Sequence, residues 1–411
     1  MKNDNRQRVC LAMAVLGLAQ AHEALAETNP FYFGAAEALT REINVFRVAK
    51  GLPETNDTYS TTSLLAGIDQ PISRQRIYLD AAARYNKYRH NSQLDNTGYS
   101  LDTGIDWETV ESLSGRIGYT GKQNLARFGA DQGPVLTTKN LERTQEFVAR
   151  GQYGGASLLS LEASYVHRQL DYSAVEYDFA EFKQDAARLG LLYRPSAALT
   201  LGIAGRHTKG KYPFVLQTAP GQFQADDYTR NDADLTASWV LTGQSTVRAR
   251  LSYTKETHQA VSTRDIAQST GALSWDFKPT GKLTFTGELI RDTGAETAFA
   301  GLAGAGASAV GNNSQLSNSA LLRIGYEVSA KVQLEFGGRY VQRDLINTQG
   351  GALPANGSDR YSETRAGLNW TPTRSVLLGC SIGQEQRSSD SALSYSYSAR
   401  VATCQGQIRL Q

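Results

Sequence analysis

The stretch Tyr193-Arg-Pro-Ser-Ala-Ala-Leu199 decides the fold of this chain. An aromatic residue is followed by five residues and then by an apolar residue, and the same frame returns at Phe277–Leu283 and Trp370–Val376. Successive copies lie roughly 40 to 50 residues apart, and a fixed period of this size marks a repeated supersecondary unit. Looser copies begin at Trp107, Tyr153, Trp239 and Tyr326, and a degenerate copy spans Ile68–Arg74.

Runs of alternating residues flank each copy of the frame. Apolar side chains recur at every second position from Ala187 to Tyr193 and again from Leu199 to Ile203. A period of two places these side chains on one face of a β-strand. The Pro-Ser or Pro-Thr pair within the clearest copies fixes one φ angle and interrupts a hydrogen-bonded ladder, which suits a tight turn. Each copy is therefore predicted to be a hairpin turn with an aromatic ring at a strand end.

Rings at strand ends are typical of the aromatic girdle of a transmembrane β-barrel. The alternative is a soluble all-β protein with ordinary hairpins. Long connections rich in Gly, Asn, Asp and Ser favour the barrel, because they all join strands at the end opposite the frames. These connections are residues 122–145, 171–184, 208–227, 292–314 and 343–357. The predicted girdle residues are Trp107, Tyr153, Tyr193, Trp239, Phe277, Tyr326 and Trp370.

Pairing the alternating runs around the eight frames predicts the fold class and the number of strands. We expect an all-β protein, a transmembrane antiparallel β-barrel of about 18 strands with short periplasmic turns and long extracellular loops. Sixteen strands is the alternative count. The first strand is expected at about residues 39–49 and the last at about 394–410.

The N-terminus has the pattern of a secretory signal peptide. Basic residues precede an apolar run from Val9 to Ala21, and Ala24-Leu25-Ala26 provides a small-x-small cleavage site. Residues 1–26 are therefore predicted to be removed, residues 27–38 to form an N-terminal periplasmic segment, and residues 39–411 to form one barrel domain. The predicted location is the outer membrane of a Gram-negative bacterium.

Composition and motifs exclude several classes of function. The formal net charge is +2 and opposite charges interleave, so no nucleic-acid partner is indicated. The sequence contains no His-Glu-x-x-His, Cys-x-x-Cys or Gly-x-Ser-x-Gly motif. We expect no metal, no cofactor and no catalytic residue, and we predict that the protein is not an enzyme. The alternative is an enzyme that modifies a polysaccharide.

The two faces of the predicted strands differ in polarity. One face is apolar, as at Leu159, Leu161 and Ala163, and the other carries charges. An Arg or Lys that faces the bilayer midplane costs about 2–4 kcal/mol, so the charged face is expected to line a hydrated lumen. Two roles stay open for these residues, ion pairing that stiffens the wall and contact with a passing solute. The candidates are Arg76, Asp80, Arg84, Glu162, Arg248, Arg250, Arg323, Glu327, Glu335, Arg339, Glu363 and Arg365.

Two further features lie outside this face pattern. Cys380 and Cys404 fall in the last two predicted strands, and a disulfide between them suits the oxidising periplasm; the alternative is two unpaired small residues. The predicted loops carry aromatic residues that either stack on sugar rings or pack a loop into the barrel mouth. These are Tyr172, Tyr177, Phe179, Tyr212, Phe214 and Phe223.

Four short stretches resemble the EpsL-type outer-membrane proteins, which are encoded with exopolysaccharide biosynthesis machinery of the exosortase (PEP-CTERM) kind. The stretches are Asn44-Val45-Phe46-Arg47, Ser73-Arg74-Gln75-Arg76, Gln93-Leu94-Asp95 and Gly210-Lys211-Tyr212-Pro213. We expect the first in strand one, the second at the entry to strand three, the third before strand four and the fourth after strand nine. The resemblance implies a role in making or exporting an extracellular polysaccharide, and it brings no catalytic residue.

The primary hypothesis is a passive outer-membrane conduit for an exopolysaccharide. Its expected partners are outer-membrane lipid, the polysaccharide chain and periplasmic components of an export system. One alternative is a general or sugar-selective porin. Another is a structural barrel, plugged by its loops, that docks other secretion proteins.

Overall fold

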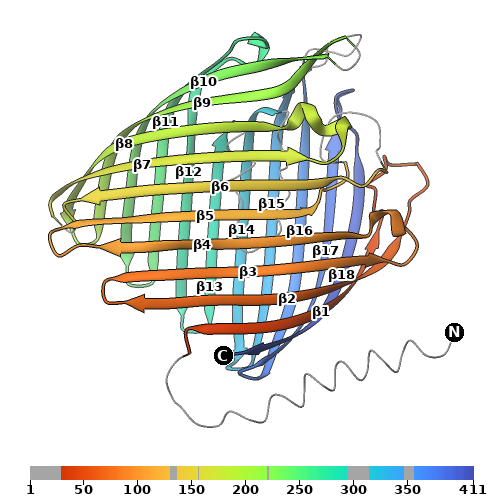
Figure 1. Ribbon diagram of the computed structural model, residues 1–411, viewed down its shortest axis with the longest axis horizontal. Coiled ribbons are helices and arrows are strands. Elements are labelled where there is room, and N and C mark those ends of the chain that lie inside the picture. Colours follow the sequence, from red (N-terminus) through yellow and green to blue (C-terminus); the bar gives the residue numbers. More distant parts are fainter. Residues whose placement is uncertain (1–28, 130–136, 156, 220–221, 294–313, 347–355) are drawn as a thin grey trace.

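Eighteen strands form one closed antiparallel barrel. The structure is a computed structural model that describes residues 29–129, 137–155, 157–219, 222–293, 314–346 and 356–411. Each strand pairs with its neighbours in the sequence, and β1 also pairs with β18, which closes the sheet (Figure 1). The predicted fold class and the count of eighteen strands are confirmed. None of the helices in the described residues has the length and apolar character needed to cross a bilayer.

The strands run from 10 to 21 residues, and a tilted strand needs about 9–11 residues to cross a bilayer. They are β1 (Phe31–Ile43), β2 (Asp57–Ile72), β3 (Gln75–Tyr88), β4 (Asn96–Glu108), β5 (Leu113–Leu125), β6 (Leu141–Tyr153), β7 (Leu159–Tyr172), β8 (Phe182–Ser196), β9 (Leu199–Ala219), β10 (Gln222–Thr242), β11 (Ser245–His258), β12 (Ile266–Thr280), β13 (Leu283–Asp292), β14 (Ser314–Ser329), β15 (Val332–Ile346), β16 (Asn356–Thr373), β17 (Val376–Ser389) and β18 (Tyr397–Leu410). Short 3-10 helices lie in three connections: η2 (Ser92–Leu94), η3 (Val175–Ala180) and η4 (Ser262–Arg264).

All eight aromatic frames are hairpin turns at one end of the barrel. The proline lies one step earlier than expected, because Pro195 belongs to the end of β8 and the turn itself is residues 197–198. The pairing of β8 with β9 shifts in register between Tyr193 and Ser196. Proline has no N–H to donate to the ladder, so it lies at such a bulge. Pro279 and Pro372 lie at equivalent register shifts.

The first strand begins earlier than predicted. β1 starts at Phe31 rather than residue 39, so most of the segment expected to precede the barrel is strand. Glu37 interrupts the alternation of apolar residues on the outward face of β1, so the sequence does not show where the strand begins. Its carboxylate accepts a hydrogen bond of 2.7 Å from Oγ1 of Thr62. Residues 44–49, which were also expected in this strand, form a loop in which Asn44 has a φ of 59°. The predicted signal peptide lies outside the described residues.

A second correction concerns residues 208–227, which were predicted to be a loop. The described part of this range, residues 208–219 and 222–227, belongs to β9 and β10, and these two strands form a hairpin that extends beyond the neighbouring strand ends (Figure 1). The glycine and aspartate residues of this segment are typical of loops, so its sequence does not indicate a strand. At Gly210 a Cβ atom would lie 2.2 Å from the ring of Tyr228, so the absence of a side chain here leaves room for this ring within the strand pair.

Contacts between strands that are not neighbours identify the inner face of the barrel. Nε of Arg188 in β8 lies 3.4 Å from Oδ2 of Asp234 in β10, and Nη2 of Arg230 in β10 lies 2.8 Å from Oδ1 of Asp292 in β13. Side chains converge in this way on the concave side of a curved sheet. The opposite face carries exposed apolar side chains and points outward. Examples are Leu161, Leu189 and Leu251, which are 47%, 59% and 60% exposed.

The outward apolar rows end before the strands do. On β9, β10 and β11 the outward series becomes polar at His207, Asn231 and Lys255, which lie opposite one another in register. At the other end the rows stop at the aromatic frames. We take the strand segments between these two limits as membrane-spanning.

Candidate functional site

Residues 126–129, which we name the mouth segment, leave β5 and lie across the loop end of the barrel. β5 pairs only with β4 and β6 among the described strands, yet Arg127 contacts Glu385 of β17. Nη2 of Arg127 also lies 3.6 Å from Oε2 of Glu363 in β16, and the carbonyl of Gly129 accepts a hydrogen bond from Arg387 of β17. Since β5 and β17 are not neighbours in the sheet, the mouth segment crosses the opening of the barrel.

Two arginines share a buried carboxylate where the mouth segment meets the wall. Nε of Arg47, from the β1–β2 loop, lies 2.5 Å from Oε1 of Glu385, and its Nη2 lies 2.6 Å from Oε1 of Glu42. The side chain of Glu385 is only 7% exposed. The hydroxyl of Tyr361 lies 3.2 Å from the same carboxylate, and the guanidinium of Arg127 lies over the Tyr361 ring at 5.0 Å. We call Arg47, Arg127, Tyr361, Glu363 and Glu385 the mouth cluster.

Electrostatics keep both arginines of the mouth cluster charged. Burial would lower the pKa of Arg47, but the carboxylates of Glu42 and Glu385 outweigh it and raise this pKa above its ordinary value. Burial acts on Arg127 in the same direction, and Tyr361 and Glu385 likewise raise its pKa. The mouth segment is therefore held by a permanent charge interaction across the opening.

Hydrophobic packing holds the mouth segment on its other side. The rings of Phe128 and Phe46 meet edge to face with centroids 5.0 Å apart. They belong to a buried cluster that also contains Val45, Tyr88 and Leu94. Three of these residues, Val45, Phe46 and Leu94, come from stretches that carry the EpsL-type resemblance. The first stretch lies in the β1–β2 loop rather than in strand one, and Gly210–Pro213 lies inside β9 rather than after it.

A second buried cluster fills part of the loop end near β7 to β11. It packs the η3 connection and the β9–β10 hairpin together, with side chains of Leu170, Tyr172, Tyr177, Phe182, Tyr212 and Tyr228. Phe179 packs against it, and Phe214 and Phe223 meet edge to face at 5.7 Å. Tyr172, Tyr177, Phe179 and Tyr212 therefore pack the loop end, which was one of the two roles left open for the aromatic residues of the predicted loops. Phe214 and Phe223 are outside this cluster, and Phe223 is exposed.

His258 joins this second cluster to a charged group. Its Nδ1 lies 2.7 Å from Oδ2 of Asp226, and its Nε2 lies 3.1 Å from Oε1 of Glu256. Burial alone would lower the pKa of His258, but the hydrogen bonds to these two carboxylates outweigh it and raise the pKa. Both His258 and Asp226 lie beyond the polar row that ends the membrane-spanning segments.

Most of the predicted lumen charges take part in polar contacts along the inner wall. Nε of Arg76 lies 2.7 Å from Oδ1 of Asp69, and Arg188 forms an ion pair with Glu162. Further pairs are Arg248–Asp276 at 2.6 Å, Arg250–Asp292 at 2.7 Å, Arg84–Ser100 at 3.1 Å, Asn369–Glu335 at 3.0 Å and Tyr32–Asp80. Arg323, Glu327, Arg339 and Arg365 share the inward register of Glu363. The wall is thus polar but largely charge-compensated.

The mouth cluster also shows what the analysis of strand faces missed. Glu363 was a candidate, whereas Arg47, Arg127, Tyr361 and Glu385 were not. Arg47 and Arg127 lie in loops, where period-two alternation gives no information about direction. Among the described residues, no group of three or more His, Cys, Asp and Glu side chains is suited to hold a metal.

A disulfide joins Cys380 of β17 to Cys404 of β18, as the sequence suggested. The two residues are directly opposed in register, with Cα atoms 4.1 Å apart. Cys380 also lies opposite Leu368 of β16, so the disulfide is on the outer face. The seven predicted girdle residues lie at the short-turn ends of the even-numbered strands from β4 to β16.

A closed barrel of eighteen strands with an apolar outer face, a polar inner face and short turns at one end is an outer-membrane β-barrel of channel-forming size. Neither a protein-family model nor a curated protein sequence matches the chain. Among solved structures, it is similar to the outer membrane protein OpdK of Pseudomonas aeruginosa, with 14% identity over 92% of this chain and 99% of that chain and a TM-score of 0.49.

Two further structures from Pseudomonas aeruginosa are similar over 92% of this chain and 98% of theirs. OccK2 (OpdF), in complex with glucuronate, has 12% identity and a TM-score of 0.49. OccK5 (OpdH) has 13% identity and a TM-score of 0.45. At these identities the similarity concerns the fold and not the substrate.

Proposed function

We propose that this barrel is a passive outer-membrane channel for small hydrophilic solutes, with uncharged sugars as the favoured class. The observation that carries the proposal is the contact of Arg127 with Glu385, which holds a loop segment across the opening of a polar barrel. Such a segment narrows the entrance, so it favours small solutes over polymers.

The inner wall supports sugars over ions as the favoured solutes. A wall with an excess of one charge concentrates the opposite ion. Here guanidinium and carboxylate groups are paired, as at Arg248–Asp276 and Arg250–Asp292, so the summed field along the wall is small. The paired groups keep free hydrogen-bonding capacity, and they can exchange weak hydrogen bonds with hydroxyl groups. Transport needs binding that is weak enough for release.

An exopolysaccharide conduit is the second candidate, and one observation favours it. The residues that carry the EpsL-type resemblance build the mouth: Asn44 donates a hydrogen bond of 2.9 Å to the carbonyl of Ser398, and Arg47 binds Glu385. In this candidate function a polymer or a periplasmic partner would have to displace the mouth segment before export. A barrel that stays closed and docks other secretion proteins is the third possibility, and a test of permeability separates it from the first two.

Liposome swelling tests the proposal directly. Proteoliposomes that contain the refolded barrel are diluted into neutral sugars of rising size, from a pentose to a hexasaccharide. We expect fast swelling with monosaccharides and a steep decline with length. Equal permeation by all lengths would favour the polymer conduit, and no swelling with a demonstrably folded barrel would favour the docking role.

A further inference from the structure

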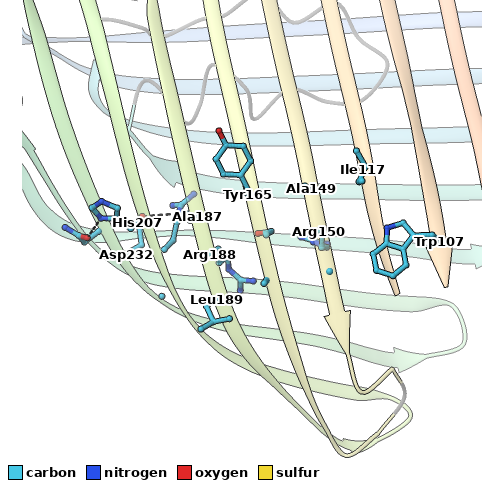
Figure 2. Close-up of a pocket in the computed structure, with 16 residues that line it drawn as sticks. Trp107, Ile117, Ala149, Arg150, Tyr165, Ala187, Arg188, Leu189, His207 and Asp232 are labelled. Atoms are coloured by element: carbon cyan, nitrogen blue, oxygen red, sulfur yellow. Dashed lines mark hydrogen bonds and ion pairs between the residues drawn. The ribbon is translucent and has the colours of Figure 1, made fainter. Parts of the chain in front are cut away.

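A depression crosses the outer face of the barrel over strands β4 to β12. It consists of two adjoining hollows of about 830 and 630 Å³, and both are lined by Leu189 and Gly205. Figure 2 shows the first hollow, with Trp107, Tyr165 and Leu189 spread over β4 to β8. Leu189 is exposed and lies opposite Gly205 in register, so both belong to the outward, apolar face.

Small residues form the floor of this depression. Ala149 and Ala187 lie on either side of Tyr165 in register, and Ala163 lies opposite Leu189. At Gly205 a Cβ atom would meet nothing within 4 Å, so the space above this residue is open. An apolar hollow between larger side chains on a membrane-facing surface fits the acyl chains of a lipid.

Lysines gather at the edge of the depression that faces the loop end. Lys183 and Lys211 are directly opposed in β8 and β9, Lys209 follows His207, and Lys255 lies opposite Asn231. All four lysines are exposed. Along this edge from β8 to β11 the outward acidic residues are Asp185 and Asp227.

Each of these aspartates already has a partner. The carboxylate of Asp185 accepts a hydrogen bond of 2.5 Å from the hydroxyl of Tyr165 and lies 2.8 Å from Nδ1 of His167. Asp227 lies 3.8 Å from Nζ of Lys211. With four lysines against two aspartates, the edge carries a net positive charge directly above the apolar hollow.

We propose that this surface binds a phosphorylated, multiply acylated glycolipid of the outer leaflet. Its acyl chains occupy the depression, and its phosphates lie against Lys183, Lys209 and Lys255. The loop end of such a barrel faces the cell exterior, which places the lysines at headgroup level in the outer leaflet. Anionic headgroups attract basic residues near the membrane surface.

A second copy of the chain is a less suitable occupant. A two-fold symmetric contact places the same patch on both subunits. The lysines of the two copies would then face one another, and like charges at an interface are unfavourable. The glycolipid proposal goes beyond the channel function and does not depend on whether the barrel conducts.

Native mass spectrometry of the full-length barrel in mild detergent tests the proposal, with purified lipid A as the probe. The wild-type barrel should retain bis-phosphorylated lipid A in preference to its dephosphorylated form. The double variant Lys183→Glu/Lys209→Glu should lower the bound fraction roughly tenfold or more, since each lysine contributes about 1 kcal/mol. The matched control Lys87→Glu, on the outward face of β3, should bind as the wild type does.

A second pair of variants tests the acyl-chain slot. Gly205→Leu fills the depression, whereas Gly338→Leu adds the same side chain on β15, where a Cβ atom likewise meets nothing within 4 Å. We expect weaker binding for the first variant alone. Equal retention of phosphorylated and dephosphorylated lipid A by the wild type would overturn the proposal. The proposal would also be overturned if each test variant and its control lost lipid A binding to the same extent, or if the barrel formed a dimer that excludes the lipid.

Discussion

Arg127, in the segment that follows β5, forms an ion pair with Glu385 of β17, a strand that is not a neighbour of β5 in the sheet. This contact holds the mouth segment, which contains Arg127, across the loop end of the barrel. Arg47 approaches the same carboxylate from the β1–β2 loop. The buried side chain of Glu385 therefore connects two loops to the barrel wall. Substitutions at Glu385 and at its arginine partners are the most direct experimental tests of how the mouth is held.

Replacing Glu385 with glutamine should destabilise the barrel. The change leaves Arg47 and Arg127 buried without their shared counter-charge, and breaking such a buried pair costs about 3–5 kcal/mol. Urea unfolding of the refolded protein, followed by tryptophan fluorescence, measures the free energy of unfolding. Glu335→Gln is the control, because Glu335 is exposed on the wall and accepts a hydrogen bond from Asn369. It should change stability by less than about 0.5 kcal/mol, and equal effects of the two changes would argue against the buried pair.

Replacing Arg127 with alanine should release the mouth segment from the wall, while the 18 strands still form a closed β-sheet. We expect higher single-channel conductance and faster passage of trisaccharides, because the ion pairs to Glu385 and Glu363 are lost. Arg143→Ala provides the control, since Arg143 is exposed and lies opposite Gln123 and Asp171 in register. Unchanged conductance in the Arg127 variant would show that the mouth segment does not limit permeation.

The packing around His258 should depend on pH. The pKa of His258 is raised in the folded protein, so its stabilising charge is fully present below the ordinary value of about 6.5 and is lost as the pH rises through the folded pKa. Asp226 has a lowered pKa, because hydrogen bonds from His258 and the backbone of Ala260 outweigh the effect of burial. Its contribution is present above about 3.9 and is lost as the pH falls through its folded pKa.

Hydrogen-exchange protection of the Ala260 amide reports this dependence, since that N–H donates a bond of 2.8 Å to Asp226. Protection factors should be highest in mildly acidic solution and should fall toward alkaline pH. In His258→Asn the alkaline decline should disappear. A decline of the same size in the variant would assign the pH dependence to another group.

Removal of the disulfide should weaken the barrel without changing its fold. Cys380 and Cys404 are 24 residues apart in the sequence, and a closed loop of this size contributes about 3 kcal/mol. The double variant Cys380→Ala/Cys404→Ala should unfold at lower urea concentration, and the reduced wild type should match it. If the oxidised, reduced and variant proteins unfold together, the crosslink does not contribute to stability.

Much of this barrel follows from a pattern with period two. The ring at Tyr193, the proline at position 195 and the apolar residue at Leu199 predict a hairpin, and eight such hairpins predict eighteen strands. The same pattern failed at Glu37, where a polar residue on the outward face hid the start of β1. It also failed over residues 208–219 and 222–227, where glycine and aspartate within the long β9 and β10 strands resembled a loop.

The mouth could not be predicted in the same way. Strand alternation gives the direction of Glu363, but it does not show which loop folds over it. The meeting of Arg127 with Glu385 depends on the closure of the whole sheet, because the two residues are 258 positions apart. The stretch Asn44–Arg47 carries a family resemblance in the sequence, and in the structure Val45 and Phe46 pack, and Arg47 pairs with Glu385, at the mouth.

Single-channel recording in a planar bilayer, with neutral oligosaccharides of rising length added on the loop side, tests the central claim most directly. The proposed channel should show a steady open conductance that short sugars reduce briefly, and Arg127→Ala should extend this effect to longer sugars. Two results would contradict a channel for small solutes with a mouth held by Arg127 and Glu385. One is a folded barrel that shows no conductance. The other is a current that long polysaccharide fragments block equally in the wild type and in Arg127→Ala.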